Sequence, residues 1–247
     1  MTVHHFFVRK EAIQFPLAII DGREHHHLQR VLRLKKGEKV RIFNEKGELF
    51  SGSVEKIEGD KTTVRLLSRL ESENLKVAIT AAPACLKTKM MDWLVQKMTE
   101  LRVMKIAPLL TKRTVVRLEG EGLGKVARWR RLAIEAAKQV QSPFFPEIRP
   151  PLPLETFVVG RPEKKKYYLS ERGGLLLRQV IQAELASGLE SLESAIICAG
   201  PEGGWEKEEE ELLQGHQFLP ISLGPRIFRA ETALFTVVSV FAHLWNG

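Results

Sequence analysis

The sequence predicts an α/β protein in two parts. A small β-barrel is expected over residues 1–70 and an α/β domain with parallel strands over residues 77–247, with a polar linker at 71–76 between them. Short apolar segments separated by turn residues fill the first part, as in closely spaced antiparallel strands. In the second part, segments of strand length alternate with helical patterns, and two glycine-rich loops follow apolar runs near the C-terminus, where α/β sheets hold their ligands.

Length and composition favour a folded protein with an ample core. The chain has 247 residues, of which 44% are apolar. No apolar run reaches the length of a membrane span, and the first nine residues lack the apolar core of a signal peptide, so we expect a cytoplasmic protein with no membrane partner. Cys85 and Cys198 lie in apolar runs, which favours core packing over a disulfide or a metal pair.

The net charge of +8 is unevenly distributed along the chain. Residues 1–70 hold 14 Lys and Arg against 9 Asp and Glu, and residues 71–150 hold 15 against 8. Residues 151–247 hold 9 against 13 and are therefore acidic. This distribution suggests a polyanion held by one part and a small ligand held by another, although a generally basic soluble protein would look the same.

The first part contains four expected strands and one helical turn. The strands are predicted at residues 3–8, 38–43, 49–57 and 61–67. The turn covers residues 25–37, and its apolar positions, expected to face inward, are Leu28, Val31, Leu32 and Leu34. Its cations, expected to project and to contact RNA phosphates unless they are merely solvated, are Arg30, Arg33, Lys35 and Lys36.

Three consecutive histidines, His25, His26 and His27, open this turn. Adjacent positions rarely converge on one ion, and no cysteine or histidine stands at ligand spacing from them. We therefore expect no bound metal.

The second part is expected to alternate strands and helices. Strands are predicted at residues 77–82, 105–110, 167–170, 195–199 and 218–223. Helices are predicted at 91–101, 124–140, 175–185 and 232–245, the last of them almost wholly apolar. The helix at 124–140 is basic and carries Trp129, which suits either nucleic-acid binding or a solvated face with Trp129 in the core. Prolines between residues 143 and 153 predict an extended crossing.

Two glycine-bearing loops carry most of the functional signal. They are Gly200-Pro201-Glu202-Gly203-Gly204 and the run from Leu223 to Ala233. Neither fits the dinucleotide fingerprint or the triphosphate loop. Glu202 would repel phosphate but could accept hydrogen bonds from an adenine amine or ribose hydroxyls, or face a cation. Ordinary tight turns remain the alternative for either loop taken alone.

Together these segments resemble the RsmE family, SPOUT-class methyltransferases that modify N3 of a uridine in 16S ribosomal RNA. The resemblance covers nearly the whole chain and rests on residues 27–38, 87–101 and 129–137, on Gly200 to Gly204 with Glu208, and on Leu223 to Ala233. It implies a PUA-like barrel followed by a SPOUT domain with a C-terminal trefoil knot. It also implies a homodimer, S-adenosyl-L-methionine as methyl donor, and 16S ribosomal RNA of the small subunit as partner, with uridine 1498 as the target.

The resemblance places the cofactor in the knot. The residues expected to hold it are Ala199, Gly200, Pro201, Gly203, Gly204, Leu223, Gly224, Ile227, Phe228, Thr232 and Ala233. Three positions depart from the family pattern: Arg102 replaces a glycine, Gln139-Val140-Gln141-Ser142 lacks an arginine of the RNA side, and Ala230 replaces a frequent threonine.

Methylation of uridine N3 requires removal of the imide proton and alignment with the methyl group. Arg229 with Glu231 is the expected catalytic pair, the arginine stabilising the developing oxyanion. The structural alternative is that Glu231 caps a backbone turn and pairs with Arg226 or Arg229. Two other functions stay open: a non-catalytic RNA-binding or ribosome-assembly protein, and a SPOUT methyltransferase for another RNA position.

Overall fold

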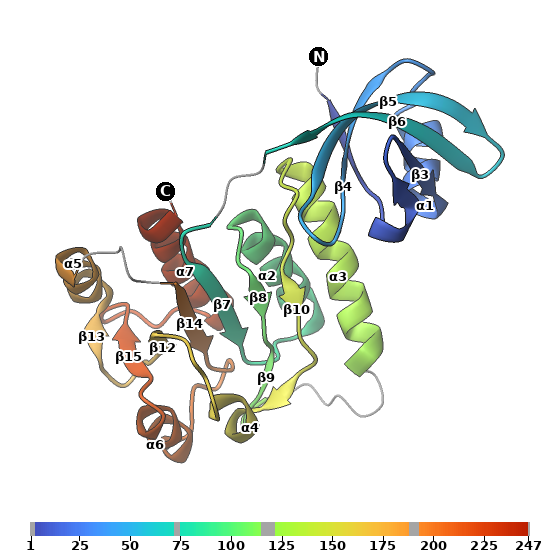
Figure 1. Cartoon of the computed structure of the whole chain (residues 1–247). Coiled ribbons are helices and arrows are strands. Elements are labelled where there is room, and N and C mark those ends of the chain that lie inside the picture. Colours follow the sequence, from blue (N-terminus) through green and yellow to red (C-terminus); the bar gives the residue numbers. More distant parts are fainter. Residues whose placement is uncertain (1–2, 72–74, 115–121, 188–192, 247) are drawn as a thin grey trace. The chain divides into compact units, whose positions relative to one another are not determined.

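The computed structural model describes residues 3–71, 75–114, 122–187 and 193–246, and the chain divides into two compact units (Figure 1). The first unit contains residues 3–71 and Ile134–Phe145, and the second contains the other described residues. The domain boundaries expected from the sequence, with a linker at 71–76, stay predictions. Within the described ranges, no helix has the length and apolar composition that crossing a membrane requires.

The first unit is built on a six-stranded sheet in the order β1-β4-β5-β6-β3-β2. Its strands are β1 (His4–Phe7), β2 (Ile13–Gln14), β3 (Leu17–Asp21), β4 (Lys39–Phe43), β5 (Leu49–Glu58) and β6 (Lys61–Leu70). β1 lies parallel to β4, whereas the other described pairings are antiparallel. The four predicted strands are confirmed. The sequence pattern missed β2 and β3, because Pro16 separates them and the exposed face of β3 carries the apolar Leu17 and Ile19.

Alternate residues of the sheet point into one apolar core, as the two-residue repeat of a strand requires. The core contains Phe6, Val8, Ala18, Ile20, Leu28, Val40, Ile42, Phe50, Val54, Val64 and Leu66. Two register shifts between β5 and β6, at Ser51/Gly52 and Val54/Lys56, mark irregularities of the ladder. Such bulges bend a strand and increase its twist, so they help these long strands to curve around the core.

The basic helical turn forms α1 (Gly22–His26) followed by a π-helical turn, η2 (His27–Val31). Leu28 is fully buried and Leu32 and Leu34 pack partly against the core, as predicted. The inward placement of Val31 is wrong, because that side chain is 61% exposed. Leu32 N donates to His27 O at 3.0 Å, a bond across five residues instead of four, and the extra residue turns Val31 outward.

The segment Ile134–Phe145 belongs to the first unit through a second small core and a buried ion pair. The core contains Phe43, Leu49 and Ala137, the last from helix α3 (Gly122–Gln139). Lys138 Nζ lies 2.8 Å from Glu24 Oε1, with both side chains largely buried. Burial raises the pKa of Glu24 although Lys138 opposes this shift.

The second unit contains a seven-stranded sheet, entirely parallel, in the order β10-β8-β7-β14-β12-β15-β13. Its strands are β7 (Ala78–Pro83), β8 (Lys105–Ile106), β10 (Glu147–Ile148), β12 (Lys165–Leu169), β13 (Leu175–Leu176), β14 (Ser194–Ala199) and β15 (Leu219–Ser222). The predicted strand at 105–110 breaks at Pro108, which has no N–H to donate. Its second half, β9 (Leu109–Leu110), pairs instead with β11 (Leu152–Pro153).

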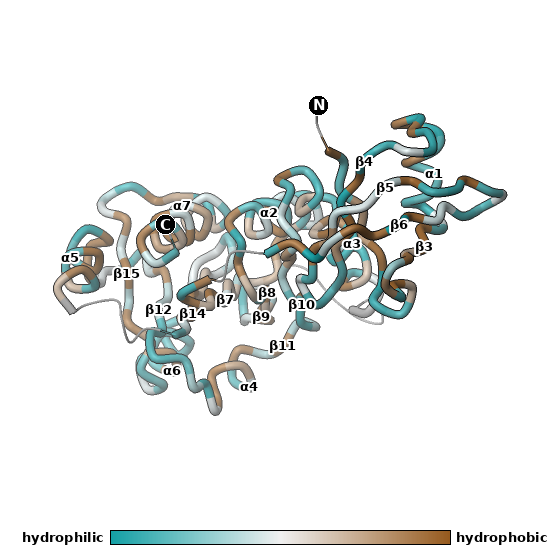
Figure 2. The backbone as a smooth tube through the Cα atoms, turned by 45° about the horizontal axis from the view of Figure 1, so that its top comes forward, coloured by the Kyte–Doolittle hydropathy of each residue, from teal (hydrophilic) through white to brown (hydrophobic). Residues whose placement is uncertain are grey.

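Different helices cover the two faces of this sheet. The covering helices are α2 (Thr88–Glu100), α4 (Leu154–Val158), α6 (Lys207–Gly215) and α7 (Ala230–Asn246). A further helix, α5 (Leu177–Ser187), follows β13. Tyr167 and Tyr168 are consecutive in β12 and therefore point to opposite faces. Tyr167 stacks on Phe241 of α7 at 5.4 Å, whereas Tyr168 belongs to the core that includes residues of α4 and α6. The apolar α7 and the hydrophilic α6 contrast clearly in Figure 2.

Three helices end in a left-handed turn that lacks glycine. The residues with positive φ are Arg102, Gln141 and Gln217, at 57°, 56° and 66°. After each, the next N–H bonds to a carbonyl five residues back, as from Val103 to Met98 at 3.0 Å, which is the Schellman arrangement. Arg102 and the segment Gln139 to Ser142, which depart from the family pattern, thus form helix ends.

The two tyrosines of β12 provide a matched test of buried hydrogen bonding. Tyr167→Phe removes a hydroxyl that donates to the buried Glu184 Oε1 at 2.7 Å, and we expect a loss of about 1.5–3 kcal/mol in unfolding free energy, because the acceptor is charged. Tyr168→Phe removes a hydroxyl that accepts from Gln214 Nε2 at 2.7 Å and should cost only about 0.5–1.5 kcal/mol. Urea unfolding of both variants measures the difference, and equal losses would contradict this account.

Candidate functional site

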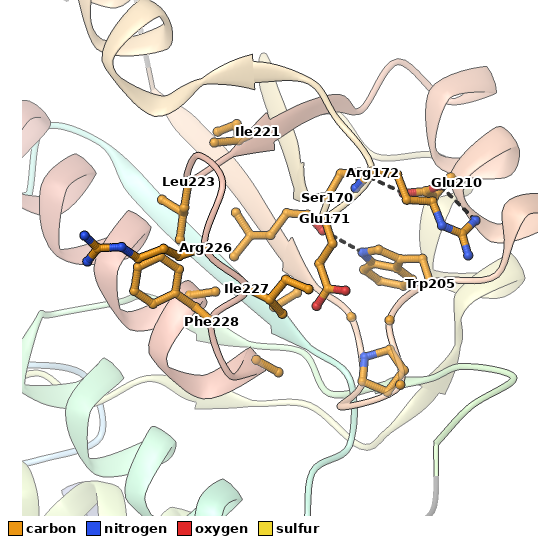
Figure 3. A pocket seen from close by; sticks show the side chains of 18 of the residues that line it. Ser170, Glu171, Arg172, Trp205, Glu210, Ile221, Leu223, Arg226, Ile227 and Phe228 are labelled. Atoms are coloured by element: carbon orange, nitrogen blue, oxygen red, sulfur yellow. Dashed lines mark hydrogen bonds and ion pairs between the residues drawn. The ribbon is translucent and has the colours of Figure 1, made fainter.

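A pocket of about 320 Å³ lies at the carboxyl ends of three neighbouring strands of the second sheet, β12, β14 and β15 (Figure 3). Because these strands are parallel, the loops that follow them gather at one edge of the sheet. The loops are residues 170–174, 200–206 and 223–229. The second and third are the two glycine-bearing loops that the sequence singled out, and both line the pocket.

The loop after β14 is shaped by a buried tryptophan. Trp205 Nε1 donates to Leu169 O at 2.8 Å, and its ring is 4% exposed. A side chain at Gly200 would place its Cβ 3.0 Å from that ring, so only glycine fits easily there. Gly204 has a φ of 71° and donates its N–H to Pro201 O at 2.9 Å, which closes a tight turn.

Arg113, which follows β9 and lines the pocket, holds this loop in place. Its Nη1 donates to Gly203 O at 2.6 Å and its Nε to Glu206 Oε1 at 2.7 Å. Glu206 is in turn the N-cap of α6 and forms a capping box with Glu209. The loop is therefore held between a helix cap and an arginine from a different part of the chain.

The loop after β12 is a wall of the pocket that the sequence-based residue set missed. Ser170 Oγ donates to Glu210 Oε1 at 2.9 Å, and Arg172 Nη1 lies 3.5 Å from the other oxygen of that carboxylate. Glu171 points into the pocket (Figure 3). The signal that could have found this loop is Glu171-Arg172-Gly173-Gly174, polar and glycine residues directly after a predicted parallel strand.

The loop after β15 adds the most exposed apolar side chains of the pocket. Gly224 has a φ of 99° and donates its N–H to Ser222 Oγ at 3.2 Å. Ile227 is 78% exposed and Phe228 36% exposed, and both line the pocket. Exposed apolar groups beside a glycine turn offer a surface on which a flat ring can stack.

Ten of the eleven residues expected to hold a cofactor line this pocket. They are Ala199, Gly200, Pro201, Gly203, Gly204, Leu223, Gly224, Ile227, Phe228 and Ala233. Thr232 does not line it: this residue is exposed in the first turn of α7, and its carbonyl accepts a hydrogen bond from Thr236 Oγ1 at 2.8 Å. Binding by the ten residues stays a prediction.

The expected catalytic residues lie in a second cavity of about 530 Å³. Its lining residues are Lys87, Met90, Glu171, Pro201, Glu202, Ile227, Phe228, Arg229, Ala230 and Glu231. Arg229 is exposed, whereas Glu231 is 7% exposed in the first turn of α7, where a carboxylate complements the helix dipole. Among the described residues, neither Arg226 nor Arg229 forms an ion pair with Glu231.

Glu202 lines this second cavity and not the first pocket. Its Oε2 lies 3.5 Å from Lys87 Nζ, and both side chains are exposed. Of the partners that the sequence allowed for this carboxylate, the structure therefore places a cation beside it.

The four cations expected to contact RNA lie in the first unit, and all are exposed. Arg30 lies within η2, and Arg33, Lys35 and Lys36 follow this turn. No ion pair of these four occurs within the part of the chain that the structure describes. Of the neighbouring histidines, His25 is buried and its Nδ1 lies 2.9 Å from Thr62 Oγ1.

Comparisons with known proteins identify two domain families in the chain. The RNA methyltransferase domain family matches residues 73–242, and the RNA methyltransferase PUA domain family matches residues 20–67. The ribosomal RNA small subunit methyltransferase E of Synechocystis sp. is 32% identical, over 84% of this chain and 67% of the relative. That of Aquifex aeolicus is 28% identical, over 97% of this chain and 99% of the relative.

Solved structures agree with this assignment. A Legionella pneumophila protein in complex with the bound cofactor SAM is 31% identical, with a TM-score of 0.87 over 98% of each chain. A Neisseria gonorrhoeae ribosomal RNA small subunit methyltransferase E bound to S-adenosyl methionine has the same fold, at 23% identity and a TM-score of 0.85 over 99% of this chain and 98% of that chain. The expected fold class, a SPOUT domain after a PUA-like domain, is confirmed, while the trefoil knot stays a prediction. The chain belongs to the RNA methyltransferase family of the ribosomal RNA small subunit methyltransferases E.

Proposed function

We propose that the pocket at β12, β14 and β15 binds S-adenosyl-L-methionine and that the protein methylates N3 of a uridine in 16S ribosomal RNA. The observation that carries this proposal is the glycine-lined pocket at the ends of three parallel strands. It occurs in a chain that is 31% identical to a protein solved with bound SAM. The named relatives act on small subunit ribosomal RNA, and we extend that substrate class to this protein.

The residues of the pocket fit such a ligand. Its volume of about 320 Å³ lies at the lower end of the range for small-molecule sites, about 300–1,000 Å³. Ile221, Leu223 and Phe228 offer apolar contacts for a purine ring, while Gly203 and Gly204 let backbone approach closely. When bound, S-adenosyl-L-methionine supplies an electrophilic methyl group on a sulfonium.

The second cavity is the proposed site of the target base. It shares the wall formed by Ile227 and Phe228 with the first pocket, so a base lying there would face the donor. A uracil turned out of the RNA could stack on the exposed ring of Phe228. Arg229 and Glu231 line the same cavity and are the only Arg or Glu of the motif from Leu223 to Ala233 that do so.

These two residues provide the chemistry that N3 needs. Glu231 accepts the N3 proton, whose bonding pair stays on nitrogen, and Arg229 stabilises the negative charge that spreads to the carbonyl oxygens. The nitrogen pair then forms the new N–C bond while the pair of the broken C–S bond stays on sulfur. Glu231 ends protonated and returns its proton to solvent.

RNA would be held by the first unit, through the phosphate contacts of Arg30, Arg33, Lys35 and Lys36. We also propose that the enzyme works in the cytoplasm as a homodimer.

Ligand binding tests the pocket directly. We expect titration calorimetry to give a dissociation constant for S-adenosyl-L-methionine between about 1 μM and 1 mM, the usual range of enzyme affinities for substrates. Gly204→Trp should weaken binding by at least about tenfold, because it fills a pocket in which overpacking costs about 1–3 kcal/mol. Gly215→Trp is the control, since a side chain at Gly215 meets no atom within 4 Å. If the unaltered protein does not bind S-adenosyl-L-methionine, the proposal that it is an enzyme is wrong, and a non-catalytic RNA-binding protein remains.

Methyl transfer tests the catalytic pair and the target atom. With small ribosomal subunits that lack the modification, we expect nucleoside mass spectrometry to detect 3-methyluridine. Glu231→Gln should lower kcat by about 100-fold or more, the usual contribution of a general base, without changing donor affinity. Glu211→Gln, on the exposed face of α6, should retain full activity. A methyl group on another atom or nucleotide, or full activity of Glu231→Gln, would contradict the proposal.

A further inference from the structure

The wall between the two cavities contains a single charged side chain. Five residues line both the donor pocket and the second cavity: Glu171, Pro201, Ile227, Phe228 and Ala230. The other four offer only apolar side chains. Any methyl group that passes from one cavity to the other must cross this wall, so Glu171 places a carboxylate beside the path of transfer.

Glu171 extends from the end of β12 into the pocket (Figure 3). Its Oε2 lies 3.5 Å from the point that a Cβ on Gly204 would occupy, so the carboxylate reaches across to the loop after β14. Within the described part of the chain, this carboxylate forms no hydrogen bond and no ion pair.

Apart from the exposed Arg226, the other charged side chains of the pocket have partners inside the protein. Arg113 donates to Gly203 O and to Glu206, and Arg172 lies 3.5 Å from Glu210. The carboxylate of Glu210 also accepts from Ser170 Oγ. Glu171 therefore offers a negative charge that the described protein groups leave available to a ligand.

We propose that the carboxylate of Glu171 faces the sulfonium of the bound donor and makes the pocket prefer the charged donor to the neutral product. This inference rests on the proposed function. Methyl transfer requires N3 and the methyl carbon to lie about 3–3.5 Å apart before reaction. The sulfonium must then lie at the wall that separates donor from acceptor, which is where Glu171 lies.

The proposal gives Glu171 a role in selecting and releasing ligands. Transfer of the methyl group turns the sulfonium into a neutral thioether, and the attraction to the carboxylate disappears. The donor is then held more tightly than the spent product, which helps the product to leave. Since the charge that Glu171 stabilises is present before the reaction, its effect belongs to binding and not to the chemical step.

The test compares three ligands that differ at the sulfur position. S-adenosylmethionine carries a positive sulfonium, sinefungin carries a positive amine there, and S-adenosylhomocysteine is neutral. In titration calorimetry, Glu171→Gln should weaken the two charged ligands by about tenfold and the neutral one by less than about twofold, the size expected for a partly solvated charge pair. Glu171→Asp should retain part of the preference.

Glu202→Gln is the matched control. It removes the same charge from the neighbouring loop, but Glu202 lines only the second cavity and pairs with Lys87. We expect the ratio of the three affinities to stay as in the unaltered protein. Thermal unfolding of each variant checks that the fold is retained.

The outcomes separate this inference from the proposed function. If the unaltered protein binds none of the three ligands, the proposed function fails. If it binds them and Glu171→Gln weakens all three equally, Glu171 holds the ribose or the amino-acid end, and the inference is wrong. It is also wrong if Glu171→Gln weakens none of the three, or if Glu202→Gln gives the same selective loss.

Discussion

The indole of Trp205 fixes the distance between two of the three loops that form the pocket. Its N–H bonds to Leu169 O at the end of β12, and its ring meets Tyr168 edge to face at 6.4 Å. Gly200, at the end of β14, lies against the same ring. Because the indole is buried and its polar atom is satisfied, it acts as a rigid spacer between the two loops. The absence of a side chain at Gly200 is thus required by the fold itself, whatever binds in the pocket.

Around this spacer the protein separates two chemical environments. Apolar side chains and glycine backbones form much of the pocket at β12, β14 and β15, where the charged groups Arg113, Arg172 and Glu210 have protein partners. The second cavity is lined by charged residues that include Lys87, Arg229 and Glu231. Two environments on either side of one thin wall suit the proposed reaction, in which a methyl group leaves a sulfonium without its bonding electron pair and joins a nitrogen that has lost its proton. The N-terminus of α7 contributes to both, since Ala230 lines the shared wall and Glu231 follows it.

Periodicity was a reliable guide to the long elements and a poor one to the details of short segments. The apolar spacing of Met91, Leu94, Val95 and Met98 predicted α2, and all four are fully buried. The predicted helix ends at residues 101 and 140 lie one residue beyond the last residues of α2 and α3, although the left-handed residues that follow, Arg102 and Gln141, are not glycine. The outward turn of Val31 depends on one π-type hydrogen bond, and the pairing of β9 with β11 after the break at Pro108 depends on which strand lies beside Leu109. Such details depend on tertiary contacts, which the local sequence pattern does not specify.

The sequence by itself determined the strand runs, the glycines of two loops and the contrast between the basic residues 1–150 and the acidic residues 151–247. The eleven residues expected to hold a cofactor came from the resemblance to the RsmE family, and ten of them line one pocket. The tertiary structure alone decided that β12 lies between β14 and β15, which brings Glu171 into the pocket, and that α7 begins at Ala230, which turns Thr232 away. The physical reason is that the residue types of a strand reflect how deeply that strand is buried. Which other strands lie beside it in a parallel sheet depends on long-range packing of the whole domain.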